Sequence, residues 1–99
     1  MAKYDVYAAA SVAGLVLDVQ ADILELLNTR IVIPLMPLLS APKPAARLNP
    51  IFEINGEQYV MATQFASAVP LGELGKPVAN LEPRFEEITV ALDMLFQGF

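Results

Sequence analysis

Acidic side chains are the first candidates for chemistry in this sequence. Asp18 and Asp22 lie four residues apart, and Glu86 and Glu87 are neighbours. Paired carboxylates can act as general acid and base, but acidic pairs as common as these usually belong to a solvated surface. Carboxylates without a characteristic spacing also give no basis for a metal site. We therefore predict no catalytic residue, no metal and no cofactor.

Other catalytic machinery lacks essential parts. The chain contains no His and no Cys, which excludes a Ser-His-Asp triad, a cysteine nucleophile and disulfide bonds. Gly72 and Gly75 are not followed by the Lys-Ser/Thr pair of a phosphate-binding loop. Arg30, Arg47 or Arg84 would suit an arginine-dependent ribonuclease, but a surface or strand-end arginine is the more ordinary interpretation. The sequence favours a binding protein over an enzyme.

Composition and charge point toward protein partners. The chain has 99 residues, of which 56% are hydrophobic and 17% charged, so we predict a single folded domain over residues 1–99. The net charge is −5, and the six Lys and Arg residues are scattered, whereas nucleic-acid binding needs clustered cations. No stretch reaches the roughly 18 apolar residues of a membrane span. We expect a cytoplasmic protein with no direct nucleic-acid contact and no membrane contact.

Strands are expected over most of the chain. Alternating β-branched and aromatic residues predict strands at 3–8 and 15–20, and the apolar run 30–39 gives the strongest strand signal. Pro34 and Pro37 cannot donate to a ladder, so we expect them at bulges or on an edge.

The intervening segments carry turn signals. Asn55-Gly56 supplies the two positive φ angles of a type I′ turn and predicts a β-hairpin. A short strand is expected shortly after it. The remaining predictions are a helical turn at 21–28, a loop at 40–50, the hairpin at 50–63, the short strand at 65–70 and a loop at 72–80.

One helix is predicted near the C-terminus. Asn80 is the expected N-cap, and Gly98 the expected C′ residue in a left-handed conformation. Apolar residues at helical spacing give it one apolar stripe: Phe85, Ile88, Leu92 and Leu95. The sequence therefore predicts a mainly β fold with one C-terminal α-helix, in which the helix packs on a small curved, barrel-like sheet.

Several fragments together resemble the CcdB family of gyrase-poisoning toxins. The resemblance covers nearly the whole chain and implies an SH3-like barrel with a small accessory sheet, a C-terminal helix and a homodimer. Apolar residues near the helix end agree with a dimer, because they are too many for one helix to bury. The fragments are DVY at 5–7, LDVQADI at 17–23, R-x-V-I-P-L at 30–35, P-x-F-x-I-x-G at 50–56, M-x-T at 61–63, V-A-N-L at 78–81 and F-x-G at 96–98.

The resemblance also implies two protein partners, the DNA gyrase A subunit and a CcdA-like antitoxin. Where the family normally has Trp-Gly followed by an aliphatic residue, this chain has Gln97, Gly98 and Phe99. The implied gyrase contacts are Phe96, Gln97, Gly98 and Phe99. The implied antitoxin contacts are Ile23, Leu24, Glu25, Asp93 and Phe96.

Three hypotheses for function follow. The first is a gyrase poison that is neutralised by its antitoxin. The second is a protein of this fold that has lost gyrase activity and keeps antitoxin binding and autoregulation, or has another target; Gln97 in place of the family's tryptophan motivates it. The third is an RNA-cleaving toxin of the related SH3-like fold. A purely structural role is the alternative for Phe99, which would pack on the last helical turn as a Schellman contact.

Overall fold

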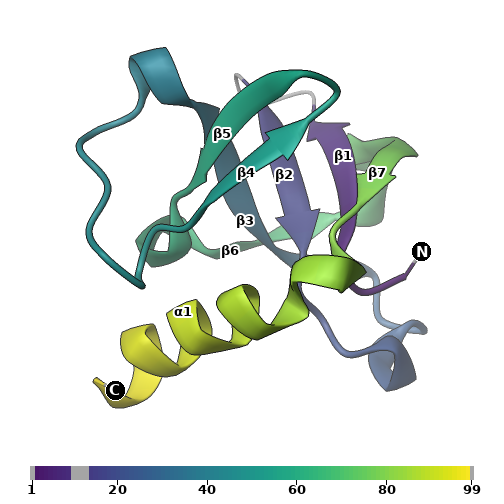
Figure 1. Cartoon of the computed structure of the whole chain (residues 1–99). Coiled ribbons are helices and arrows are strands. Elements are labelled where there is room, and N and C mark those ends of the chain that lie inside the picture. The colour runs from purple at the N-terminus through teal and green to yellow at the C-terminus, as the bar shows by residue number, and fades with distance from the viewer. Residues whose placement is uncertain (1, 10–13, 99) are drawn as a thin grey trace.

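The computed structural model describes residues 2–9 and 14–98, and Phe99 lies outside these residues. Within them, seven antiparallel strands form one sheet in the order β4-β5-β3-β2-β1-β7, and β6 also pairs with β3. The sheet is followed by one α-helix, α1 (Figure 1), so the predicted fold class is confirmed. The bounds are β1 Asp5–Ala9, β2 Leu15–Asp18, β3 Thr29–Pro37, β4 Ile51–Ile54, β5 Glu57–Met61, β6 Ser67–Pro70, β7 Leu74–Asn80 and α1 Phe85–Gln97.

The strand β3 is the centre of the sheet. One edge pairs with β2, while the other edge pairs first with β6, over Thr29–Val32, and then with β5, over Leu35–Pro37. Pro34 lies between these two partners, so the prediction of a bulge or an edge strand is wrong for it. The carbonyl of Pro34 accepts a hydrogen bond from the Ala62 amide on that side, where its own missing N–H also points. The proline is tolerated because the strand changes partner there.

The hairpin prediction is confirmed by the backbone. Asn55 and Gly56 have φ angles of 52° and 85°, and Ile54 pairs with Glu57 across the two-residue turn. The helical turn expected at 21–28 is present as a short 3-10 turn.

The segment predicted as a loop at 72–80 is instead the strand β7. It pairs with β1 at the edge of the sheet, with two register shifts, and it is largely exposed. Gly75 and Pro77, together with the lack of polar–apolar alternation, concealed the strand, because an exposed edge strand needs neither a buried face nor every ladder hydrogen bond.

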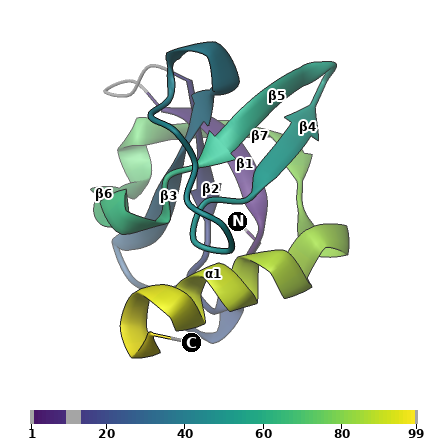
Figure 2. The ribbon, with the colours of Figure 1, turned by 60° about the vertical axis from the view of Figure 1, so that its left-hand side comes forward.

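Two apolar cores lie on opposite faces of the sheet, because neighbouring strand residues point to opposite faces. The larger core packs against α1, which runs below the strands in both views (Figures 1 and 2). The smaller core lies on the other face. The larger core contains Val6, Leu17, Ile33, Leu35, Phe52, Ile54, Met61, Leu81, Ile88 and Ala91; the smaller contains Tyr7, Ala9, Val16, Val32, Val69 and Leu74.

The two ends of the helix differ from each other in how they are capped. The prediction of Asn80 as N-cap of the helix is wrong, because Arg84 occupies that position and a 3-10 turn precedes it; the Asn80 side chain instead accepts a hydrogen bond from the Glu82 amide, 2.8 Å away, at the start of that turn. Gly98 ends α1 as predicted, with φ of 81° and its amide bonded to the Met94 carbonyl. Of the predicted stripe, Ile88 is buried and Leu92 and Leu95 are half-buried, but Phe85, the first residue of α1, is exposed.

Candidate functional site

An apolar groove lies between the C-terminal half of α1 and the segment that joins β2 to β3. Its volume is about 390 Å³. Leu24 and Leu27 contribute from the joining segment, and Leu92 and Phe96 contribute from the helix. Grooves lined mainly by apolar side chains are the usual places where a protein accepts a ligand or a partner. The remaining lining residues are Val19, Gln20, Ala21, Thr29, Ile31 and Ala66.

Residues 21–28, within the segment that joins β2 to β3, are here called the apolar loop. All of its residues are exposed, including Ile23 at 88% and Leu26 at 93%. Phe96, on the opposite wall of the groove, is 76% exposed. Single exposed apolar residues are common on protein surfaces, but a contiguous set of large ones marks an interaction surface.

The end of α1 presents the predicted gyrase contacts. Phe96 and Gln97 are both exposed on the last turn, and the left-handed conformation of Gly98 ends the helix directly after them. The helix end is therefore open to a partner at Phe96, Gln97 and Gly98. The fourth predicted contact, Phe99, lies outside the described residues.

A buried ion pair supports the base of the apolar loop. The Nε and Nη2 atoms of Arg30 each lie 2.8 Å from Asp18 Oδ2, and both side chains are almost completely buried. Burial raises the pKa of Asp18 above its ordinary value, although hydrogen bonds from the Gln20 amide and from Arg30 act in the opposite direction. Removing either partner would leave an uncompensated charge in the interior. Asp18 thus has a structural role at the base of the apolar loop.

Tyr7 lies close to this ion pair in the smaller core. Its hydroxyl group donates a hydrogen bond of 3.2 Å to Asp5 Oδ2. Burial, followed by the negative charge of Asp5, raises the pKa of Tyr7 to about 12. The phenol therefore stays protonated well beyond neutral pH.

The three arginines considered for RNA cleavage lie in different environments. Arg30 is buried against Asp18, and Arg84 is paired with Glu87 on the first turn of α1. Arg47 is exposed at a turn where its own φ is 66°. The described residues also contain no group of three or more ligating side chains arranged to hold a metal ion. Among these residues, none of the helices combines the length and the apolar character needed to span a bilayer.

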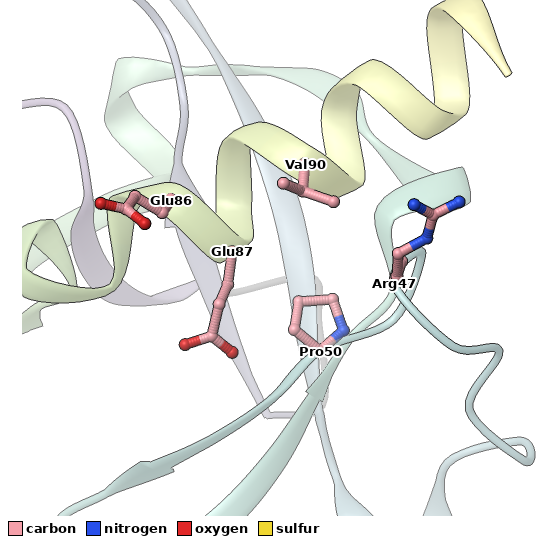
Figure 3. Close-up of a pocket in the computed structure, with 5 residues that line it drawn as sticks. All are labelled: Arg47, Pro50, Glu86, Glu87 and Val90. Atoms are coloured by element: carbon pink, nitrogen blue, oxygen red, sulfur yellow. The ribbon is translucent and has the colours of Figure 1, made fainter. Parts of the chain in front are cut away.

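A second hollow, of about 420 Å³, lies between α1 and the loop that precedes β4. Figure 3 shows Arg47 and the two glutamates, Glu86 and Glu87, on opposite sides of Pro50. Val90 and Pro50 supply the apolar part of its lining. Its charged side chains are of opposite sign and indicate no particular ligand, so the apolar groove is the stronger candidate.

The structure brings together some of the predicted antitoxin contacts. Leu24 and Phe96 lie on opposite walls of the same groove, although most of the chain separates them in sequence. Ile23, Glu25 and Asp93 are exposed but do not line the groove.

Sequence reasoning missed several residues of the groove. Gln20, Leu27 and Ile31 all line it, but none was singled out as a site residue. The available signal was the run of apolar residues in a segment too short to be an amphipathic helix. Gln20 carried no signal, because its role depends on which backbone groups the fold places around it.

Comparison with known proteins identifies the family. The model of the CcdB protein family matches residues 3–98. The fold is also similar to a solved structure described as an endoribonuclease in complex with its cognate antitoxin from Mycobacterial species. That similarity has a TM-score of 0.76 and 16% sequence identity, covering 96% of this chain and 93% of the other. At this identity it shows the shared fold alone, whereas the family match spans nearly the entire sequence: the chain belongs to the CcdB family.

Proposed function

We propose that this protein is the toxin of a type II toxin–antitoxin system, that it binds the DNA gyrase A subunit and traps the gyrase–DNA complex, and that a CcdA-like antitoxin neutralises it. The observation that carries the proposal is the exposed helix end, Phe96 to Gly98, in a chain that matches the CcdB family over residues 3–98. An open helix end beside an apolar groove suits a protein target.

The proposed action is binding without catalysis, in the cytoplasm. Gyrase poisoning requires a complementary surface rather than an active site. Two of the three arginines considered for RNA cleavage are engaged by carboxylates, and the net charge of −5 opposes contact with phosphates. These features support a protein target over RNA, although the solved structure with a similar fold is called an endoribonuclease.

The antitoxin is proposed to bind at the apolar loop and the adjacent groove. Leu24 and Phe96 offer apolar contact, and Glu25 and Asp93 are exposed carboxylates on the same two elements. A segment that carries both apolar and basic residues would complement this surface. Such a segment would order on binding, which lowers its affinity relative to the area buried.

A homodimer is the proposed assembly. The helix end carries Met94, Leu95 and Phe96, of which the first two are half-buried and the third is exposed in one chain. Pairing around a twofold axis is the commonest way to cover such a surface. Analytical ultracentrifugation at micromolar concentration should give twice the monomer mass of 10.7 kDa, and a monomer mass would contradict this assembly.

Induced expression in bacterial cells tests the function. Growth arrest with gyrase-linked DNA breaks, relieved by a gyrase A variant that resists CcdB toxins, is the expected result. Growth arrest with rapid RNA decay would indicate an RNA-cleaving toxin instead. Harmless expression would favour the second candidate, a CcdB-family protein that keeps antitoxin binding without gyrase activity.

Gln97 is the specific observation that favours this second candidate. A tryptophan at this exposed position would add about 100 Å² of apolar contact area, worth roughly 2–3 kcal/mol of binding free energy. We therefore expect Gln97→Trp to tighten binding of the gyrase A subunit by roughly 30- to 150-fold in a titration. Thermal melting of both proteins controls for folding. Nanomolar binding by the unaltered chain, without improvement by tryptophan, would show that Gln97 already forms a good contact.

A further inference from the structure

We infer that Gln20 is a positioning residue whose buried amide holds the apolar loop in the conformation that a partner recognises. The inference rests on the proposed function, because it takes the apolar loop as part of the antitoxin surface. It adds a residue that contacts the loop's backbone from below and presents almost nothing to the partner itself, since only 6% of Gln20 is exposed.

Packing covers the apolar loop only in part, because Leu24 and Leu27 are 46% and 49% exposed while Ile23 and Leu26 are 88% and 93% exposed. Every residue from Ala21 to Thr29 is exposed, and the 3-10 turn within it buries none of its residues. Ordering a backbone residue opposes folding by roughly 1–2 kcal/mol, so a loop without buried side chains needs another source of order. Three internal turn hydrogen bonds, from the amides of Leu24, Glu25 and Leu27, shape it only locally.

Gln20 supplies bonds that join the two arms of the loop. Its Nε2 donates to the carbonyl oxygens of Leu24 and Thr29, each at 3.2 Å. Its Oε1 accepts from the Ile31 amide at 3.0 Å. All three bonds go to main-chain atoms, which fixes the path of the loop without restricting which side chains it displays.

Gln20 is itself held in place by the buried ion pair. Its amide nitrogen donates to Asp18 Oδ1 at 3.0 Å, and its carbonyl accepts from Arg30 Nη2 at 3.4 Å. The loop has further ties at its two ends: the Lys3 amide donates to Asp22 Oδ1 at 2.7 Å, Arg30 Nη2 lies 4.0 Å from the same oxygen, and the Leu71 amide donates to the Asn28 carbonyl at 3.1 Å. The ion pair, the amide and the loop thus form a continuous chain of contacts from the interior to the surface.

The chemistry of this position is specific to a primary amide. Two donors face two carbonyl oxygens while one acceptor faces an N–H group, and glutamine provides that combination. In Gln20→Glu, a carboxylate oxygen would replace the donor and face both carbonyls. In Gln20→Met, the side chain keeps a similar length but forms none of the three bonds.

Order in the loop should translate into affinity. If the free loop adopts the recognised conformation only part of the time, the apparent dissociation constant rises in inverse proportion to that fraction. A loop that is competent one-tenth of the time would bind its partner about tenfold more weakly. The Gln20 variants should therefore weaken binding, although Gln20 itself, at 6% exposed, offers almost no surface to a partner in the groove.

The test compares Gln20→Met and Gln20→Glu with two controls. Gln58→Met makes the same exchange at an exposed position on β5, and Ile54→Val lowers stability within the core, away from the loop. Hydrogen exchange at the amides of Leu24, Glu25 and Leu27, which all bond within the loop, reports loop order directly. A titration with the C-terminal segment of a CcdA-family antitoxin reports recognition.

We expect about tenfold faster exchange at these amides and about tenfold weaker binding in both Gln20 variants, with neither change in the controls. Unchanged exchange in the Gln20 variants would overturn the inference, as would faster exchange with unaltered affinity. If the unaltered protein fails to bind the antitoxin segment, the proposed antitoxin site fails, whereas hydrogen exchange still decides whether Gln20 orders the loop.

Discussion

Two loops of this molecule are held by the same kind of side chain but display different surfaces. Gln20 ties the apolar loop from below, and Asn49 ties the loop at 41–50. Asn49 Nδ2 donates to the Met61 carbonyl at 3.0 Å, and its Oδ1 accepts from the Ala45 amide at 3.1 Å. Both amides are buried and both bond mainly to main-chain atoms.

The two loops differ in the side chains that they expose. The loop at 41–50 exposes Pro42, Lys43 and Arg47, whereas the apolar loop exposes Ile23 and Leu26 among others. Since a buried amide can order a loop whatever its surface, exposed apolar side chains are not needed for folding. Their concentration in one loop agrees with the partner surface proposed there.

The largest expected effect comes from the Asp18–Arg30 ion pair beneath the apolar loop. The loop at 41–50 rests on the neutral amide of Asn49 instead. Asp18→Asn removes the close partner of the buried Arg30 charge and leaves only Asp22, at 4.0 Å, so we expect it to lower the free energy of unfolding by about 3–5 kcal/mol. Urea denaturation measures the loss, with Glu53→Gln, at an exposed carboxylate on β4, as the matched control. The double variant Asp18→Leu/Arg30→Met should recover much of the loss. A loss below about 1 kcal/mol for Asp18→Asn would mean that the pair is not buried in solution.

Alkaline pH should lower the free energy of unfolding through the region of the Asp18–Arg30 pair, because Tyr7 lies near this pair. Asn49, which supports the other loop, does not titrate. The pKa of Tyr7 is about 12 in the folded chain against 10.0 for the free side chain. Its contribution to stability is complete below about pH 10 and declines as pH rises through about 12, because the unfolded chain ionises first. The decline amounts to about 2–3 kcal/mol.

Urea denaturation from about pH 9 to about pH 12 would detect this decline. Tyr7→Phe, compared with the unaltered protein at each pH, isolates the contribution of this residue from those of Tyr4 and Tyr59. Parallel curves for the two proteins would show that Tyr7 ionises as an exposed tyrosine does.

The next largest loss of stability is expected from replacing the buried amide of Asn49, which supports the loop at 41–50. Asn49→Ala removes its hydrogen bonds and leaves buried main-chain groups unpaired, so we expect a loss of about 2 kcal/mol in unfolding free energy. Thermal melting and urea denaturation measure it. Antitoxin affinity should stay unchanged at a temperature where the variant is folded. If Asn49→Ala weakened binding as much as Gln20→Met, the loop at 41–50 would belong to the recognition surface as well.

The smallest effect on stability is expected from variants of the exposed apolar side chains in and beside the two loops. Ile23 is 88% exposed, and Leu39, which precedes the other loop, is fully exposed. Ile23→Ala and Leu39→Ala should each change stability by less than about 0.5 kcal/mol. Only Ile23→Ala should weaken antitoxin binding, by about 1 kcal/mol or more, as measured by calorimetric titration. Equal losses from the two variants would remove the distinction between the loops.

Local patterns predicted much of the fold. Residue alternation indicated β1 and β2, and Asn55-Gly56 indicated the hairpin, because each signal lies within a few residues of the structure it specifies. The strand β7 was missed because its pairing with β1 depends on residues far away in sequence. The prediction for Pro34 was wrong for the same reason. The sequence of β3 alone does not indicate that its pairing partner changes from β6 to β5.

The candidate site was less accessible to sequence reasoning. Leu24 and Phe96 were named through the family resemblance, and the structure shows that they share a groove. Gln20 could not be predicted, because nothing in its neighbourhood identifies the carbonyls of Leu24 and Thr29 as its acceptors. Buried polar roles of this kind appear only when backbone positions are known.

The pairing of β1 with β7 has a consequence for the order in which the molecule folds. This pairing joins Asp5 to Asn80, and α1 follows directly after β7. Contacts so distant in sequence form slowly, because a long chain must close before they contribute stability. Strands β1, β2 and β3 pair with their neighbours in sequence, so they are free to associate early. We therefore expect the helix wall of the groove to form last, so that a nascent chain would acquire the proposed partner-binding surface only at the final stage of folding.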